Sequence, residues 1–333
     1  MNQAMKLLLC EFITAGGYAG HAVPGDLAAE GELMLQALLR DFSDCAAAFA
    51  IQELIVLRDT RLPSASRPGD SVTVTVTPVS DNFTAQFAVA CAQADAVLLV
   101  APETDGCLLR LTQQVQTAGK QSLGSTAAAV SIAASKSQTS ALLQQHGITV
   151  VPCWREPGAI KHETLAQTSQ WIVKPDDGVG GEGCRLLSTL PTTLAAGEIL
   201  QPYIAGEPAS LTLLCHNDTA AVWSANRQES IFDASDYRMK AIGVNDLEYS
   251  HDVLQQLADD IAAALPGLTG WVGVDLVITR RGPCVLEVNP RPTTAYAGLR
   301  ESVGQNPAAA LLTLLQEQKM LAPEHRQPVW VTL

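Results

Sequence analysis

The sequence predicts an α/β protein built from more than one lobe. In its first third, short apolar runs of strand length alternate with a segment of helical periodicity, the order of elements expected of a sheet covered by helices. The hydrophobic fraction of 47% with only 5% aromatic residues favours an interior packed from aliphatic side chains. At 333 residues the chain exceeds the usual size of one compact domain, so we expect two or three lobes.

A first α/β lobe is predicted over residues 1–122. Its opening strand, Lys6–Cys10, is followed by a glycine-bearing loop and then by a helix over Asp26–Asp41. Within residues 58–80, valines alternate with threonines and indicate an exposed strand. Two apolar runs predict buried strands, the second of which ends in Pro-Glu-Thr-Asp-Gly and so delivers polar groups into a cleft. These runs are Leu54–Leu57 and Ala96–Ala101.

Shorter elements are predicted beyond the first lobe, in segments 123–190 and 191–320 and in a tail or final strand over 321–333. Ser135 is a candidate N-cap for a helix that runs through Leu143 and stops at Gly147. A second amphipathic helix is expected later in the chain, between strands. The predicted strands are Thr149–Trp154, Trp171–Lys174, Glu198–Ile204, Ser210–Cys215, Ala220–Ala225, Trp271–Thr279 and Cys284–Val288, and the later helix is His251–Leu265.

Composition disfavours several classes of partner. The net charge of −13, without a run of basic residues, would repel DNA or RNA, so no nucleic-acid partner is expected. The apolar run Leu7–Leu9 is too short for a signal peptide or a membrane span, which predicts a cytoplasmic protein without a membrane partner. The eight cysteines contain no CxxC pair and are read as reduced thiols.

A glycine-rich loop follows a strand that carries a lysine. Glycine lets the backbone adopt positive φ and lets N–H groups approach an anion, and Lys174 adds a positive charge, so the segment predicts a phosphate cradle. The alternative is a flexible hairpin turn beside an incidental lysine. The loop has neither the ending of a Walker A motif nor the strand-to-helix context of a dinucleotide fingerprint. Its glycines are Gly178, Gly180, Gly181 and Gly183.

Three oxygen-bearing side chains predict a metal site. Glu287 and Asn289 lie two residues apart on one strand, so they share a face, and a hairpin with the preceding strand would place Asp275 beside them. Carboxylate and amide oxygens suit Mg²⁺. The alternative is the solvated face of an edge hairpin, which is disfavoured because carboxylates between apolar neighbours are costly without a cation.

Four further residues are candidates for ligand contacts. Arg291, between two prolines, could reach a transferring phosphate, and Arg227 is a second candidate, although a surface salt bridge explains it nearly as well. Lys136 near a helix start invites an anion, with a solvent-exposed lysine as the alternative. Gln201, in the strand through Ile204, could meet an adenine edge.

The order of these motifs resembles the ATP-grasp superfamily over the second half of the chain. The resemblance implies two α+β subdomains that clasp ATP, a preceding Rossmann-like domain, and Mg²⁺ or Mn²⁺ on the Asp, Glu and Asn residues. It also implies that Lys136 and Lys174 hold phosphates. Many members have glutamate where this chain has Gln201, and Pro208 interrupts the pattern next to Glu207. The hinge residues expected to contact the nucleotide are Gln201, Tyr203, Ile204 and Glu207.

Within that superfamily, the segments 10–17, 101–106 and 287–296 are similar to the group that contains tyramine–glutamate ligases of methanofuran-type (methylofuran) cofactor synthesis. The implied reaction is ATP-dependent amide formation between a small-molecule acid such as glutamate and a small or aromatic amine, through an acyl phosphate. Arg291, Lys174 and Arg227 would carry the phosphoryl transfer. A small-molecule kinase and a non-catalytic nucleotide-binding protein are the alternatives, and a homodimer stays open.

The acceptor pocket is expected at the carboxyl ends of the first-lobe strands. The residues proposed to line it are Glu11, Gly16, Gly17 and Glu103, which are equally well explained as ordinary loop residues. Glu11, Glu103 and Asp177 are the alternatives for the group that assists deprotonation of the amine.

Overall fold

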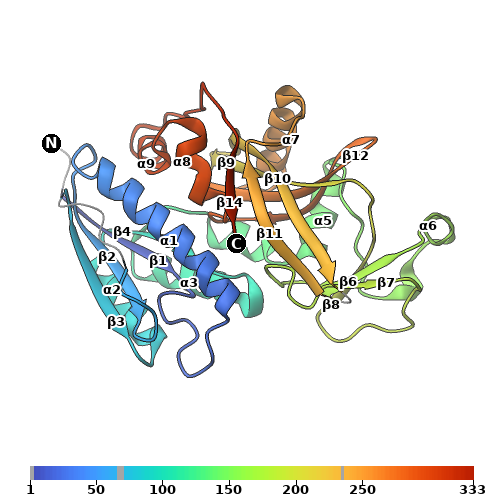
Figure 1. Cartoon of the computed structure of the whole chain (residues 1–333), viewed down its shortest axis with the longest axis horizontal. Helices are drawn as coiled ribbons and strands as arrows, with labels where there is room; N and C mark the ends of the chain where they lie inside the picture. Colours follow the sequence, from blue (N-terminus) through green and yellow to red (C-terminus); the bar gives the residue numbers. More distant parts are fainter. Residues whose placement is uncertain (1–3, 66–70, 234–235) are drawn as a thin grey trace.

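Three sheets organise the chain. The computed structural model describes residues 4–65, 71–233 and 236–333. Within these ranges the strands form a five-stranded, a three-stranded and a six-stranded sheet, and the six-stranded sheet lies between the other two (Figure 1). Residues of the five-stranded and the six-stranded sheets share one hydrophobic core, which holds those two parts of the molecule together.

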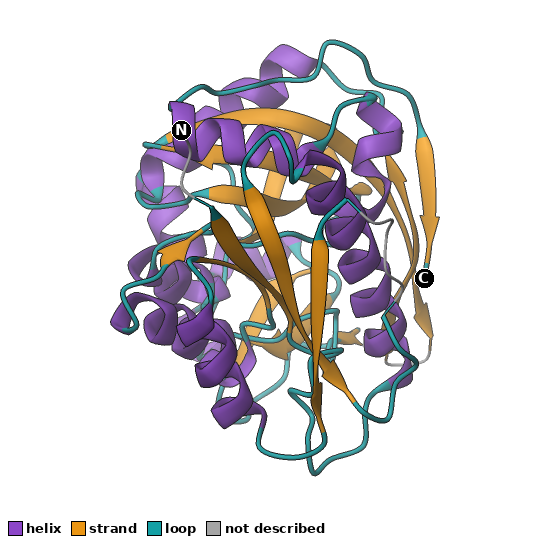
Figure 2. Cartoon of the chain, turned by 90° about the vertical axis from the view of Figure 1, so that its left-hand side faces the viewer, coloured by secondary structure: helices purple, strands orange, loops and turns teal. Residues whose placement is uncertain are grey.

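The five-stranded sheet is parallel and is covered by helices on both faces (Figure 2). Its order is β3-β2-β1-β4-β5, so the connections change direction between β1 and β4. Alternate residues of β1 pack oppositely: Leu7 lies in the core with α1, whereas Leu8 lies in the core with α2 and α3. The elements are β1 (Met5–Glu11), α1 (Gly25–Cys45), β2 (Ile51–Asp59), β3 (Thr73–Val79), α2 (Phe83–Gln93), β4 (Ala96–Val100), η1 (Thr104–Gly106), α3 (Cys107–Thr117) and β5 (Gln121–Ser122).

The six-stranded sheet is antiparallel, in the order β13-β12-β9-β10-β11-β14. One face packs on α7, and the other packs on α8, α9 and α1 around Trp223, Trp271 and Tyr296, whose rings meet edge to face. The elements are β9 (Glu207–His216), β10 (Thr219–Asp233), β11 (Asp236–Val244), α7 (His251–Ala264), β12 (Gly270–Thr279), β13 (Gly282–Asn289), α8 (Tyr296–Val303), α9 (Pro307–Glu317) and β14 (Val329–Thr332).

The small sheet has its own hydrophobic core on one face and two candidate site residues on the other. Val173 and Leu200 belong to its own core with Trp154 and Trp171, so the alternating residues Lys174 and Gln201 project from the opposite face. The order of its strands is β7-β6-β8. The remaining elements are α4 (Ala127–Ala133), α5 (Lys136–Gln145), η2 (Pro157–Ala159), α6 (His162–Gln167), β6 (Trp171–Pro175), β7 (Arg185–Leu187) and β8 (Glu198–Pro202).

Most predicted elements are present, with one correction. Ser135 caps α5 by accepting a hydrogen bond from the backbone of Gln138, as expected of an N-cap. The strand predicted over Thr149–Trp154 is wrong, because the segment forms only isolated bridges from Val150 and Trp154. Pro152 lies between them and has no N–H to donate to a ladder. The predicted domain boundaries stay predictions.

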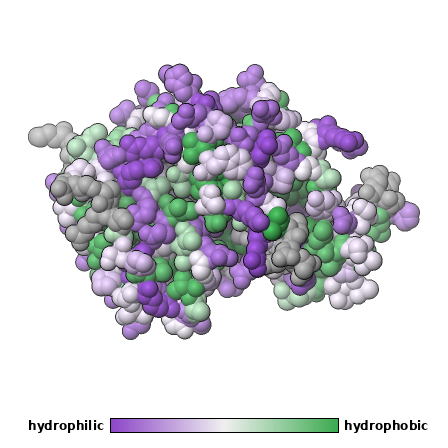
Figure 3. All heavy atoms as spheres, viewed as in Figure 1, coloured by the Kyte–Doolittle hydropathy of each residue, from purple (hydrophilic) through white to green (hydrophobic). Residues whose placement is uncertain are grey.

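Hydrophilic and hydrophobic residues are interspersed over the face of the molecule seen in Figure 3. In the ranges that the structure describes, no helix combines the length and the apolar character needed to cross a bilayer.

Candidate active site

Two carboxyl groups face each other on the central sheet. Asp275 of β12 pairs directly with Glu287 of β13, and a bulge follows in the ladder between Asp275 and Leu276. The two carboxyls are close enough for each to shift the pKa of the other. Burial and the charge of Glu287 raise the pKa of Asp275. Burial alone would also raise the pKa of Glu287, but two nearby lysines lower it.

The third predicted metal ligand adjoins this pair. Asn289 lies opposite Gly273, on the same sheet face as Glu287, and its amide donates a 3.0 Å hydrogen bond to Asp275. The other oxygen of Asp275 accepts a 2.7 Å bond from Gln228 of β10, a residue that sequence reasoning missed. Two carboxyls in contact with an adjoining amide are oxygen donors that suit Mg²⁺ or Mn²⁺, so the residues present fit a divalent cation.

Lys136 joins the first turn of α5 to the carboxyl pair. Its ammonium lies 3.0 Å from Glu287 and also donates to the carbonyl of Gly178, at the start of the glycine-rich loop. Burial lowers the pKa of Lys136, but the charge of Glu287 outweighs this effect and the pKa is raised. The buried lysine is therefore charged, and the alternative of a solvent-exposed lysine is wrong.

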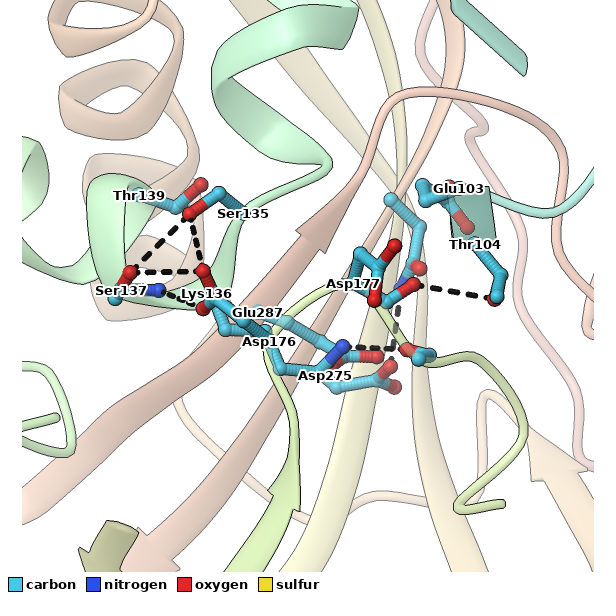
Figure 4. Close-up of polar contacts among 12 residues, drawn as sticks. Glu103, Thr104, Ser135, Lys136, Ser137, Thr139, Asp176, Asp177, Asp275 and Glu287 are labelled. Carbon is cyan, nitrogen blue, oxygen red and sulfur yellow. Dashed lines mark hydrogen bonds and ion pairs between the residues drawn. The ribbon is translucent and has the colours of Figure 1, made fainter. Parts of the chain in front are cut away.

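Asp176 fixes the position of that helix. Its carboxylate accepts hydrogen bonds from the Ser137 backbone at 2.7 Å and the Ser135 hydroxyl at 2.8 Å, so it caps α5 from the β6 end (Figure 4). The Asp176 carbonyl also accepts from Lys136 N. Sequence reasoning took this residue only as part of the glycine-rich segment. The same contacts that cap the helix hold Lys136 against Glu287.

Lys174 is the second lysine of the cluster. It projects from β6 toward Glu287, whose charge attracts it. The pKa of Lys174 is lowered, chiefly by burial. The like charge of Lys136 also lowers this pKa, whereas the charge of Glu287 raises it. Within the described part of the chain its ammonium has no hydrogen-bond or ion-pair partner. Two neighbouring ammonium groups with one carboxylate between them are a site for an additional anion.

The glycine-rich loop joins β6 to β7 with a backbone that requires glycine. Gly180, Gly181 and Gly183 have φ values of 62°, 78° and 70°. A Cβ on Gly181 would lie 2.1 Å from the ring of Tyr237 of β11, and a Cβ on Gly178 would lie 3.0 Å from Pro175. Tyr237 is a second residue that sequence reasoning missed, and its ring fixes how closely the loop approaches the central sheet.

The same loop is anchored to the first lobe. Asp177 accepts a 2.9 Å hydrogen bond from the backbone of Asp105 through its carboxylate, and a 3.2 Å bond from the Thr104 hydroxyl through its carbonyl (Figure 4). The donors belong to η1, directly after β4. A turn of the parallel sheet thus positions the loop over the carboxyl pair.

The predicted hinge residues differ in burial and in their contacts. Gln201 is buried and donates a 2.8 Å hydrogen bond to the thiol of Cys153, on the sheet face that carries Lys174. Tyr203 is exposed and Ile204 is half-buried, directly after β8. Glu207 opens β9 and lies 3.1 Å from Arg227. The structure thus places Gln201 beside the lysines and engages Glu207 with an arginine.

Arg227 lies apart from the carboxyl pair. Neighbouring residues on a strand point to opposite faces, and Gln228 points to Asp275. Arg227 instead contacts Glu207 and Asp246, at 3.1 and 3.4 Å. The contact between Arg227 and a phosphate is therefore unsupported by this geometry, which agrees better with the alternative of a salt bridge.

Arg291 and Glu103, predicted for different tasks, bind each other. Two guanidinium N–H groups of Arg291 donate to the two carboxylate oxygens of Glu103, at 3.0 and 2.9 Å. Burial opposes the charge of Arg291, but Glu103 outweighs it and the pKa is raised. Glu103 also lines a small pocket with Lys136, Glu287 and Asn289. Arg291 is thus connected to this pocket through Glu103, a residue of the first lobe.

The other proposed acceptor residues have structural contacts. Glu11 is buried and accepts hydrogen bonds from the backbones of Ile13 and Thr14, at 3.1 and 2.7 Å. Burial raises the pKa of Glu11. Gly16 and Gly17 let the following turn pack closely, because added Cβ atoms would meet Val79 and Phe12. These contacts favour structural roles for the three residues, with Glu11 at the end of β1 and the two glycines in the loop after it. Their part in an acceptor pocket stays a prediction.

Comparison with known families agrees with this geometry. A model of the family described as ATP-grasp domain matches residues 133–295, and one described as pre ATP-grasp 3 domain matches residues 52–130. The first match contains the two lysines, the glycine-rich loop and the carboxyl pair. Residues 133–295 therefore match an ATP-grasp domain, and the segment before them matches a pre ATP-grasp domain.

Among curated proteins, the chain is similar to two tyramine–L-glutamate ligases. The protein of Methanocaldococcus jannaschii is 26% identical over 223 residues, which are 66% of this chain and 62% of the relative. The protein of Methanocaldococcus fervens is 23% identical over 212 residues, 62% of each chain. The matched region therefore spans about three fifths of the length of these relatives.

Solved structures share the fold. A protein of Archaeoglobus fulgidus, described as a member of the ATP-grasp superfamily, superposes with a TM-score of 0.73 at 22% identity and covers 99% of this chain and 92% of its own. Biotin carboxylase of Campylobacter jejuni has a TM-score of 0.71 at 13% identity, over 95% and 72% of the two chains. N5-carboxyaminoimidazole synthetase of Staphylococcus aureus, complexed with ADP, has a TM-score of 0.67 at 14% identity, over 100% and 83%.

Proposed function

We propose that this protein is an ADP-forming ligase that joins a carboxylic acid to an amine at the expense of ATP. The observation that carries the proposal is the cluster of Lys136 and Lys174 around Glu287, with Asp275 in contact on the next strand. Two ammonium groups supply positive charge for phosphates, and the carboxyl pair supplies ligands for a divalent cation. The curated relatives that match the chain are ligases.

The cluster suits phosphoryl transfer by positioning and charge neutralisation. ATP would lie between the small sheet and the central sheet, with its phosphates against Lys136, Lys174 and the glycine-rich loop. Asp275, Glu287 and Asn289 would hold Mg²⁺ or Mn²⁺, which supplies charge neutralisation to phosphate oxygens when bound. No covalent enzyme nucleophile is required.

In the first step, a carboxylate oxygen of the acid attacks the γ-phosphorus, and ADP leaves. In the second, the amine first releases the proton of its ammonium form to a carboxylate, for which Glu11, Glu103 and Asp177 are the candidates. Its nitrogen then attacks the acyl carbon, inorganic phosphate leaves, and the nitrogen loses a second proton. Arg291 lies beside the cluster and would neutralise the acyl phosphate. We propose L-glutamate as the acid and tyramine as the amine, because these are the substrates named by both curated relatives.

The test is an array of acids and amines that begins with L-glutamate and tyramine. ADP release and product mass are measured together in the presence of Mg²⁺ or Mn²⁺. Stoichiometric ADP, phosphate and amide are expected for the true pair, and Glu287→Gln should abolish all three. ADP release with a phosphorylated acid as the final product would indicate a kinase, and ATP binding without turnover on any pair would contradict an enzymatic function.

A further inference from the structure

The Glu103–Arg291 pair lies at the boundary between the first lobe and the site. Glu103 follows β4 of the parallel sheet, and Arg291 follows β13 of the central sheet. Their side chains are largely buried, with exposed fractions of 6% and 13%. The pocket beside Glu103 is also lined by Lys136, Glu287 and Asn289. This inference rests on the proposed ligase function and concerns what happens to the pair during the reaction.

An anionic substrate would compete with Glu103 for Arg291. A carboxylate or an acyl phosphate accepts the same two parallel N–H groups that the Glu103 carboxylate accepts. Once displaced, Glu103 would be a buried carboxylate without a partner, a costly state unless a cation takes the place of the guanidinium. A ligase of this class has such a cation among its substrates, because an aliphatic amine is protonated at neutral pH.

The other nearby carboxylates would each keep a partner when the substrates bind. Glu11 is held by two backbone N–H groups. Asp177 accepts from the backbone of Asp105, and Glu287, which is paired with Lys136, would also hold the divalent cation. Glu103 differs because its partner is Arg291, the arginine proposed to neutralise the acyl phosphate. Displacement by substrate therefore changes the charge balance at Glu103 more directly than at the other three.

We propose that Glu103 is the docking group for the ammonium of the amine substrate, and that it becomes available when the acid or its acyl phosphate displaces it from Arg291. The ligand class is a primary ammonium ion. Two consequences follow: the acid is bound before the amine, and the ion pair occupies the amine site until then.

The experiment compares Glu103→Gln with the unsubstituted protein using a charged and an uncharged nucleophile. The charged nucleophile is tyramine, or the amine that the array identifies, and the uncharged one is hydroxylamine, which traps an acyl phosphate as a hydroxamate. The substituted amide would keep an acceptor for Arg291 but lose the negative charge. We expect KM for the amine to rise by roughly tenfold or more, as for loss of one charged contact. Hydroxamate formation should continue at close to the original rate, which also shows that the variant is folded.

A matched control is Glu53→Gln, which removes the charge of a glutamate that is paired with Lys6 at 2.9 Å. Lys6 lies near the start of β1, at the end of the parallel sheet opposite to the site. It should leave both reactions unchanged. An unchanged KM for the amine in Glu103→Gln, or an equal loss of amide and hydroxamate, would overturn the inference while leaving the ligase function intact. Failure of the unsubstituted protein to form either product with any acid would overturn the ligase function itself.

Discussion

Arg291 donates two parallel hydrogen bonds to Glu103, at 3.0 and 2.9 Å, across 188 positions of sequence. The pair joins the loop after β13 to the carboxyl edge of the parallel sheet. Because both groups are largely buried, the contribution of the pair to stability depends on whether one partner or both are removed.

Removal of one partner should cost far more than removal of both. Arg291→Leu leaves the Glu103 carboxylate buried and unpaired, and we expect the free energy of unfolding to fall by about 3 kcal/mol. The double variant Arg291→Leu/Glu103→Leu should lose much less, since no uncompensated charge remains. Urea denaturation of the four proteins in this cycle measures the difference. A double variant as unstable as the sum of the single variants would show that the two residues do not interact.

Asp176 should stabilise α5 mainly through its cap. Asp176→Ala removes acceptors for Ser135 and Ser137, and we expect a loss of about 1–2 kcal/mol. Arg155, whose side chain is 62% exposed, contacts the same carboxylate, but Arg155→Ala should cost below about 1 kcal/mol because solvent screens the pair. Thermal denaturation of both variants provides the comparison. Equal losses would indicate that the ion pair, rather than the cap, holds the helix.

The metal ligands could be predicted because they depend on local rules. Residues two apart on a strand share a face, and a short hairpin connects β12 to β13, so Asp275, Glu287 and Asn289 had to converge once both strands were recognised. The pairing of Glu103 with Arg291 follows no such rule. It depends on how the first lobe docks on the central sheet, and no periodicity in the sequence reports that arrangement.

Other misses have similar physical causes. Gln228 and Tyr237 belong to the long strands β10 and β11, whose alternation is weakened by polar residues, so neither drew attention as a neighbour of the site. The apolar segment Thr149–Trp154 satisfied the pattern of a strand, but Pro152 limits its pairing to two bridges. Sequence patterns therefore predicted the elements and the local clusters better than the contacts between lobes.

Gly181→Ala should impair nucleotide binding more than it impairs folding. The residue has a φ of 78°, and an added Cβ would lie 2.1 Å from Tyr237, so the loop must shift. We expect a cost of about 1 kcal/mol in stability and a clear rise in KM for ATP. Gly119→Ala is the matched control, because its φ is 67° and nothing lies within 4 Å of its Cβ. A similar KM for ATP in both variants would contradict a role of the loop in nucleotide binding.

Binding of Mn²⁺ should strengthen as pH rises. The pKa of Asp275 is raised, so above the usual aspartate range the folded protein retains a proton that the unfolded chain has already released. The stability of the metal-free protein therefore falls as pH rises above that range. A cation replaces that proton and removes the penalty. The lowered pKa of Glu287 has the opposite sign and loses its effect only in strongly acidic solution.

The measurement is the shift of Tm on addition of Mn²⁺, at mildly acidic and at mildly alkaline pH. The shift should be larger at alkaline pH, and calorimetry should detect proton release on binding. Asp275→Asn should remove both effects, because an amide has no proton to exchange for the metal. A shift independent of pH would show that the carboxyl pair does not bind the cation.

Substitution of the two lysines should have different effects on the stability of the ligand-free protein. Lys136 is paired with Glu287 at 3.0 Å, so Lys136→Met leaves a buried carboxylate unpaired and should cost about 3 kcal/mol in the ligand-free protein. Lys174 is a buried cation whose pKa is lowered, so Lys174→Met removes an unfavourable charge and should leave Tm unchanged or raise it. Both variants should lose the stabilisation that Mg²⁺ and ATP confer, because each removes a phosphate contact. Lys6→Met, at a half-exposed surface pair, should keep that stabilisation and alter Tm little. A marked destabilisation by Lys174→Met without ligand would mean that this lysine supports the fold rather than awaiting an anion.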